Sequence, residues 1–111
     1  MKIIGRNKAC VVYLGSADLK RPRAIEHAFE EIVRVLKRKR VVLDLSGVSA
    51  VTSLSASALI AANAVASARE VDVRFAGLKP LVRRFLKKLG VFESLATYES
   101  VDAALESFEE E

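Results

Sequence analysis

The amino-acid sequence predicts a single α/β domain, residues 1–111, built on a mostly parallel sheet of four to five strands with about four helices. The length of 111 residues suits one domain, because domains cluster near about 100 to 150 residues. The composition, 51% hydrophobic with only five Gly and two Pro, provides enough apolar surface for a compact core. Short apolar strands alternate with helical patterns, and this alternation implies right-handed crossovers between parallel strands.

Two short apolar runs open the chain, KII at residues 2–4 and ACVVYL at residues 9–14. GRNK joins them with turn-forming residues, so we expect a hairpin whose first strand is an antiparallel sheet edge. After the loop SADLKRP, apolar residues recur every three or four positions and predict a helix from about residue 22 to 38. Its predicted apolar face contains Ile25, Ala28, Phe29, Ile32, Val33 and Leu36.

Three further strands alternate with three further helices in the rest of the chain. Residues 41–45 (VVLDL) and 71–76 (VDVRFA) predict buried strands, and residues 95–97 a short one. An alanine-rich helix begins near Leu54, a third helix runs from Pro80 to a stop at Gly90, and Ser100 caps a terminal helix. The predicted apolar stripes are Leu54, Ala58, Leu59, Ala62, Val65 and Ala66 in the alanine-rich helix, and Leu81, Val82, Phe85, Leu86 and Leu89 in the next.

Several functional classes are disfavoured by composition. No apolar run approaches the roughly 20 residues that span a bilayer, and the first ten residues do not resemble a secretory signal. We therefore expect a cytoplasmic protein without membrane insertion. One cysteine and one histidine cannot form an internal disulfide or a structural zinc site, so we expect neither a metal nor a cofactor.

The net charge of +4 comes mainly from two basic clusters, KRKR at residues 37–40 and RRFLKK at residues 83–88. The simplest interpretation is a solvated helix end followed by a solvated helix face. Nucleic-acid binding is a low-probability alternative, because aromatic residues make up only 6% of the chain and Trp is absent.

A cluster of hydroxyl groups stands in the stretch VTSLSASALI, residues 51–60. Thr52 and Ser53 follow a predicted strand and open a helix, and Asp18 also follows a strand. Because functional groups gather beyond the carboxyl ends of parallel strands, we expect these two loops to be neighbours. Ser53 is a candidate helix cap, a candidate phosphate acceptor, or each in turn.

Catalysis by Ser53 has little support in the sequence. No GxSxG elbow is present, no lysine follows at SxxK spacing, and the only histidine, His27, lies on the first predicted helix. Gly-rich phosphate loops are also absent. We therefore expect that the protein is not an enzyme, and a hydrolase is the least favoured interpretation.

Three segments in order carry a resemblance to a known family. They are GSADL at residues 15–19, VVLDLSGVSAVTSLSASALIAA, and LKPLVRRFLKKLGVFESLATYESVDAAL. Together they resemble the STAS-domain family, which includes the anti-sigma-factor antagonists, over nearly the whole chain. The resemblance implies a regulatory module that binds an anti-sigma factor, which is also a serine kinase. It also implies that this kinase phosphorylates Ser53 and that Asp18 lies in the partner-facing patch.

Near Ser53 the sequence differs from the family pattern. Thr52 stands where the family usually has Asp, Leu54 where it has Ser or Thr, and Ser55 where it has Gly. With Ser57, these residues are the predicted partner-binding positions. The differences also support an alternative, a constitutive STAS subunit of a stress-sensing or lipid-transport complex. A homodimer is compatible with either hypothesis.

Overall fold

The computed structural model describes the chain except for residues 7, 36, 38, 110 and 111. The described residues form five strands, four α-helices and two short 3-10 turns. The strands are β1 (Lys2–Arg6), β2 (Ala9–Gly15), β3 (Arg40–Gly47), β4 (Asp72–Ala76) and β5 (Thr97–Tyr98). The helices are α1 (Pro22–Arg34), α2 (Ser53–Ala68), α3 (Pro80–Lys88) and α4 (Val101–Glu109), and the 3-10 turns are η1 (Asp18–Lys20) and η2 (Phe92–Ser94).

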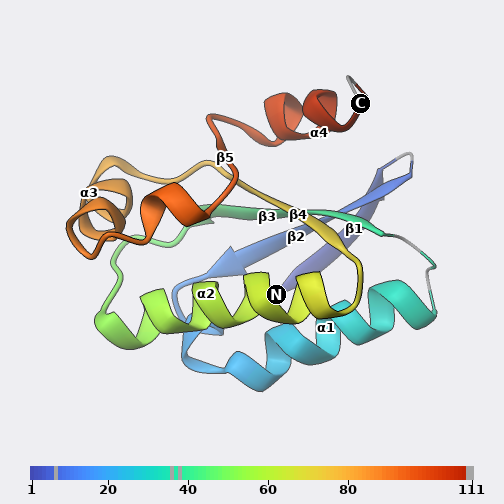
Figure 1. Cartoon of the computed structure of the whole chain (residues 1–111), viewed down its shortest axis with the longest axis horizontal. Coiled ribbons are helices and arrows are strands. Elements are labelled where there is room, and N and C mark those ends of the chain that lie inside the picture. Colours follow the sequence, from blue (N-terminus) through green and yellow to red (C-terminus); the bar gives the residue numbers. More distant parts are fainter. Residues whose placement is uncertain (7, 36, 38, 110–111) are drawn as a thin grey trace.

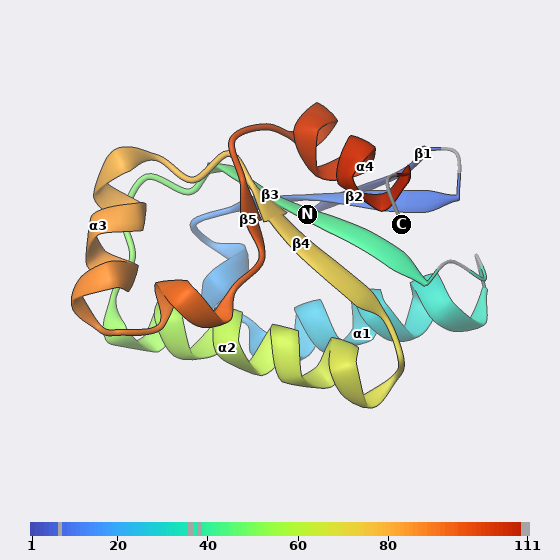
Figure 2. The same ribbon diagram turned by 45° about the horizontal axis from the view of Figure 1, so that its top comes forward.

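The strands form one mixed sheet in the order β1-β2-β3-β4-β5. β1 pairs antiparallel with β2, which confirms the predicted hairpin, and every other pairing is parallel. The predicted α/β fold with an antiparallel edge strand is therefore confirmed. In Figures 1 and 2, α1 and α2 cover one face of the sheet, and α4 lies on the other.

The larger core lies between the sheet and the layer of α1 and α2. Alternate residues of the inner strands point into it, among them Val12, Leu43 and Phe75. α1 contributes the predicted residues Ile25, Phe29 and Ile32, and all of these are almost completely buried. A smaller core under α4 contains Ala9, Val11, Val42, Ala76, Ala104 and Phe108.

α1 ends earlier than the apolar pattern predicts. The predicted end was near residue 38, whereas the last helical residue is Arg34 and Val35 follows as the C-cap. The next described residue, Lys37, has a φ of 54°, which no right-handed helix accommodates. Val35 is 62% exposed, so the apolar pattern continued beyond the buried face of the helix. Leu36, a predicted member of that face, lies outside the described residues.

Two predicted stripes include residues that face outward. Leu54 is 64% exposed and Leu81 is 65% exposed, so neither belongs to the core. In α2 the buried face instead follows Ser55, Leu59, Ala62 and Ala66, which recur at four-, three- and four-residue intervals. In α3 the fully buried residues are Val82 and Leu86, and the predicted Leu89 is partly exposed as well.

The last strand is short and begins later than predicted. β5 contains only Thr97 and Tyr98, whereas the predicted strand covered residues 95–97. The preceding 3-10 turn explains the shift, because the backbone N–H of Leu95 donates to the carbonyl of Phe92. Leu95 is buried in the larger core as part of that turn.

Candidate functional site

The candidate site lies where β2 and β3 end, at the carboxyl edge of the parallel strands. Gly15 and Gly47 are paired at this edge, and a Cβ on Gly47 would come within 2.9 Å of the Leu14 carbonyl oxygen. The loops that follow are joined, because the backbone N–H of Ser49 donates to Ser16 Oγ over 3.2 Å. The predicted proximity of these two loops is therefore confirmed.

Thr52 is the N-cap of α2. Its backbone is extended, and Thr52 Oγ1 accepts a hydrogen bond of 3.2 Å from the backbone N–H of Ser55. This contact satisfies one of the free N–H groups at the beginning of the helix. Thr52 Oγ1 also lies 3.3 Å from Ser55 Oγ, and Ser55 is only 7% exposed. The cap is thus Thr52, and the prediction of Ser53 as a candidate helix cap is wrong.

Ser53 is the first residue of α2, and it is exposed. Its carbonyl accepts a hydrogen bond of 3.0 Å from Ser57 Oγ, so the Ser57 hydroxyl is engaged within the helix. Within the described part of the chain, no hydrogen-bond partner is found for the Ser53 hydroxyl. Of the four hydroxyls predicted here, only that of Ser53 is both exposed and unengaged.

Asp18 closes its own loop. Asp18 Oδ2 accepts a hydrogen bond of 2.8 Å from the backbone N–H of Gly15, and Oδ1 lies 3.4 Å from the amino group of Met1. The side chain retains 20% exposure, so part of the carboxylate remains at the surface of the η1 loop. Asp18 therefore holds the loop that adjoins the beginning of α2.

A hollow lies between the η1 loop and the beginning of α2. Lys20 lines it from η1, Ser49 from the connecting loop, and Thr52 with Leu54 from the α2 side. No acidic residue stands in the first turn of α2, so the partial positive charge of the helix end is not neutralised there. The hollow thus combines a cation, a helix N-terminus and the exposed Leu54 side chain.

Asp44, in the segment VVLDLSGVSA, is a contributor to this edge that sequence analysis did not identify. It is 7% exposed within the second half of β3, and its carboxylate accepts hydrogen bonds from both the backbone N–H and the Oγ of Ser46. Gly77 faces it with a φ of 71°, and a Cβ there would lie 2.7 Å from Asp44 Oδ1. The signal in the sequence was a carboxylate within an apolar strand.

The basic clusters also differ in part from their predicted places. Lys79, Arg84, Lys87 and Lys88 are exposed on or beside α3, as expected of a solvated helix face. In KRKR, however, Arg40 is the first residue of β3 and not part of a helix end. Arg38 of that cluster lies outside the described residues.

Family comparison assigns the chain to a known class. The family model described as the STAS domain matches residues 10–104, so the protein belongs to the STAS-domain family. No curated protein sequence matches the chain. Among the described residues, no helix is long and apolar enough to cross a membrane, and no group of three or more His, Cys, Asp or Glu is placed to hold a metal.

Solved structures share the fold at low sequence identity. A chain from a structure of the stressosome, described as a signal integration and transduction hub, has a TM-score of 0.83 at 20% identity and covers 98% of this chain and 96% of its own. A serine-to-glutamate variant of RsbS from Moorella thermoacetica has a TM-score of 0.81 at 18% identity, covering 98% and 94%. An anti-sigma factor antagonist from Mycobacterium paratuberculosis has a TM-score of 0.75 at 22% identity, covering 96% and 90%.

Proposed function

We propose that the protein is a non-enzymatic regulatory module of the cytoplasm, which binds an anti-sigma factor with serine-kinase activity and is switched by phosphorylation of Ser53. One observation carries the proposal: the Ser53 hydroxyl is exposed and unengaged, while those of Thr52, Ser55 and Ser57 make local contacts. A kinase that approaches this helix end would meet a hydroxyl free to accept a phosphoryl group. Solved relatives described as an anti-sigma factor antagonist and as part of the stressosome support the same role.

The electrostatics of the helix end support phosphate at Ser53. A phosphate adds about 1.5 to 2 negative charges, and a helix N-terminus favours an anion. Lys20 adds a positive charge to the adjoining hollow, whereas Asp18 adds a partly exposed negative charge nearby. Phosphorylation would therefore reverse the charge that a partner meets at this edge, while Thr52 would continue to cap the helix.

The surface around Ser53 also supplies an apolar contact for a partner. Leu54 is 64% exposed, and burial of its apolar side chain against a partner would be favourable. Ser57, one turn further along α2, is exposed, and Asp18 is partly exposed in the η1 loop. Thr52 and Ser55 contribute chiefly by shaping the helix end, because their hydroxyls lie against one another.

The proposal is tested by incubating the purified chain with the serine kinases of its host and mapping phosphate by mass spectrometry. We expect phosphate on Ser53, and we expect the phosphorylated chain to lose the kinase complex in a pull-down. Ser53→Ala should abolish labelling. The matched control is Ser57→Ala, which removes a hydroxyl one helical turn further along but should leave labelling unchanged. Phosphate on another residue, or none with any host kinase, would contradict the switch.

A second function is favoured by the exposed apolar residues. Leu54 and Leu81 are each more than 60% exposed, and the beginning of α2 and α3 lie at the same end of the molecule in both views (Figures 1 and 2). Such leucines suit a permanent interface in a stress-sensing or lipid-transport complex, which would not require phosphorylation. A pull-down from the host separates the hypotheses: recovery of an ATPase with a permease supports the permanent subunit, and recovery of a kinase-like anti-sigma factor supports the switch.

A further inference from the structure

A recess lies on the α4 face of the sheet, at the opposite end of the parallel strands from Ser53. It has a volume of about 590 Å³, and its lining includes Arg6, Lys8, Ala9, Arg40, Leu105 and Phe108. Pockets for small organic ligands usually have volumes of about 300 to 1,000 Å³. The recess is therefore large enough for a small molecule, and none of its residues belongs to the site around Ser53.

The register of the sheet explains why the recess forms. Arg6 pairs with Ala9, and Ala9 pairs with Arg40, so the three residues form one row across adjacent strands. Residues in one row point to the same face, and strands are about 4.8 Å apart, so the two arginine Cα atoms are about 10 Å apart. The small side chain of Ala9 between two long ones leaves the space.

Contacts with α4 show that this row faces the helix. Arg6 lies 3.6 Å from Asp102 of α4, and Arg40 Nη1 donates to the Phe108 carbonyl over 3.3 Å. Ala9 packs in the smaller core with Phe108, and the Arg40 guanidinium lies 5.5 Å from the Phe108 ring centroid. The recess thus has an alanine floor, arginines on both sides and apolar residues of α4 above it.

The charge of the recess favours an anion. Among the residues that the structure describes, three cations, Arg6, Lys8 and Arg40, line it against one carboxylate, that of Glu109. The ion pair of Arg6 is easily exchanged, because the Arg6 side chain is 47% exposed and the Asp102 side chain is 81% exposed. A ligand anion between the two guanidinium groups could replace Asp102 and accept hydrogen bonds from both arginines.

We propose that this recess binds a small organic anion, a phosphate or carboxylate, that carries an apolar group. The anionic group would lie over Ala9 between Arg6 and Arg40, and the apolar group would contact Leu105 and Phe108. Because this ligand would touch both the β1-β2 hairpin and α4, its binding would hold the helix against the sheet. The proposal is independent of phosphorylation at Ser53, which lies at the other end of the strands.

The test is an NMR titration of the ¹⁵N-labelled full chain with phenyl phosphate. Two probes each lack one part of the proposed ligand: inorganic phosphate lacks the apolar group, and benzyl alcohol lacks the charge. We expect saturable shifts of the amides of Ala9, Leu105 and Phe108 with phenyl phosphate, and binding at least about tenfold weaker with either partial probe. Amides around Ser53 should not shift.

Charge-removing variants identify the residues responsible. Arg6→Gln and Arg40→Gln should each weaken phenyl phosphate binding about tenfold, because each removes a charge-assisted hydrogen bond. Lys88→Gln is the matched control, since it removes one exposed cation from the end of α3 and should leave binding unchanged. An NMR spectrum with the same peak dispersion as that of the native chain would show that each variant is folded. The proposal would be overturned if inorganic phosphate bound as tightly as phenyl phosphate, if the shifts were centred on Ser53, or if no shifts were seen. It would also be overturned if folded Arg6→Gln and Arg40→Gln kept the full affinity.

Discussion

Thr52 and Ser53 are adjacent in the chain, but their hydroxyl groups have different surroundings. Thr52 Oγ1 accepts from the backbone N–H of Ser55, whereas the Ser53 hydroxyl points to no partner among the described residues. The difference arises because the N-cap residue is extended, while the next residue already has helical geometry. One residue thus stabilises the helix, and its neighbour is left available for chemistry.

Loss of the cap should lower stability without changing the fold. Thr52→Ala removes the acceptor for the Ser55 N–H, and we expect the free energy of unfolding to fall by about 0.5 to 2 kcal/mol in urea denaturation. Thr52→Asp is the matched control, because Asp also caps helices well and should retain most of that stability. Equal stability of the native chain and Thr52→Ala would show that the cap contributes nothing.

Helices could be predicted from the sequence where the spacing of apolar residues matches the buried face in the structure. α1 shows this agreement at Ile25, Phe29 and Ile32, which repeat at helical spacing and are all buried. The prediction was wrong for Leu54 and Leu81, and each is the second residue of its helix. Because side chains one position apart point in different directions around the helix axis, a small error in the predicted apolar face moves a side chain from the core to solvent. Both residues are apolar and fit the spacing, so sequence alone did not distinguish them from core residues.

The site was predictable to the level of its loops but not of its individual contacts. The position of Asp18 and Ser53 after parallel strands indicated that their loops would meet, as the Ser49–Ser16 hydrogen bond confirms. Whether Thr52 or Ser53 is the cap depends on which of the two has an extended backbone, and helix boundaries predicted from sequence are not accurate to one residue. Whether Ser53 accepts phosphate stays a prediction.

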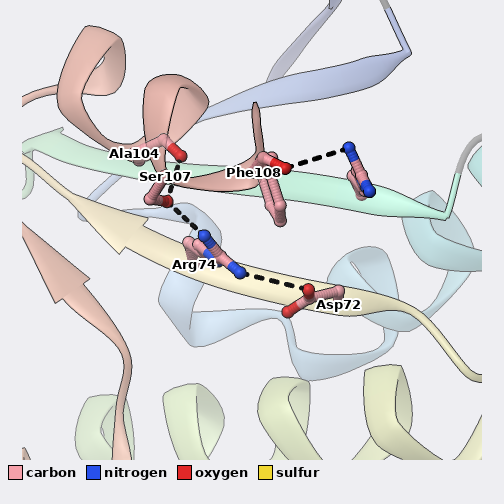
Figure 3. A network of polar contacts seen from close by, with 6 residues as sticks. Asp72, Arg74, Ala104, Ser107 and Phe108 are labelled. Carbon is pink, nitrogen blue, oxygen red and sulfur yellow. Dashed lines mark hydrogen bonds and ion pairs between the residues drawn. The ribbon is translucent and has the colours of Figure 1, made fainter. Parts of the chain in front are cut away.

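α4 is contacted from the sheet by a buried arginine that sequence analysis did not identify. Arg74 of β4 is 7% exposed, donates to Ser107 Oγ in α4 and to Asp72 over 3.3 Å, and lies 4.1 Å from the Phe108 ring centroid (Figure 3). The signal was present in the run VDVRFA, where an arginine stands between apolar residues of a predicted buried strand. An arginine in such a position requires partners on the face it points to.

Removal of this arginine should loosen α4 in particular. In Arg74→Met, the apolar stem remains, but the hydrogen bond to Ser107 and the cation–π contact of the guanidinium with the Phe108 ring are lost. We expect amide hydrogen exchange in α4 to accelerate about tenfold or more, while α1 amides change much less. Ser107→Ala, which removes one of these contacts, should have a smaller effect. Equal acceleration in α1 and α4 would show that Arg74 supports the whole fold instead.

At the scale of the whole molecule, positive charge is distributed rather than gathered for nucleic acid. The exposed cations of α3 lie at one end of the fold, whereas Arg40 lines the recess beside α4 and Arg74 is buried in contact with that helix. Among the described residues, the two basic clusters of the sequence thus lie on different surfaces. The net charge of +4 alone supports only weak, salt-sensitive attraction to a polyanion.

This distribution predicts that duplex DNA is not a partner. In fluorescence anisotropy with a labelled generic duplex, we expect no binding at about 150 mM salt, because few phosphates could be contacted at once. Replacing Lys87 and Lys88 by Gln should then have no effect on the measured anisotropy. Binding that persists at this salt concentration and is weakened by those two substitutions would favour the nucleic-acid hypothesis.

β3 extends from Arg40 at the recess to Gly47 beside the Ser53 loops, a length of about 23 Å at 3.3 Å per residue. Substitutions separated by such a distance, without shared contacts, usually have additive effects on stability. The two ends of the strand can therefore accumulate sequence changes separately. A lineage that altered its protein partner at Ser53 could keep the arginine recess intact, and one that lost the recess could keep its partner.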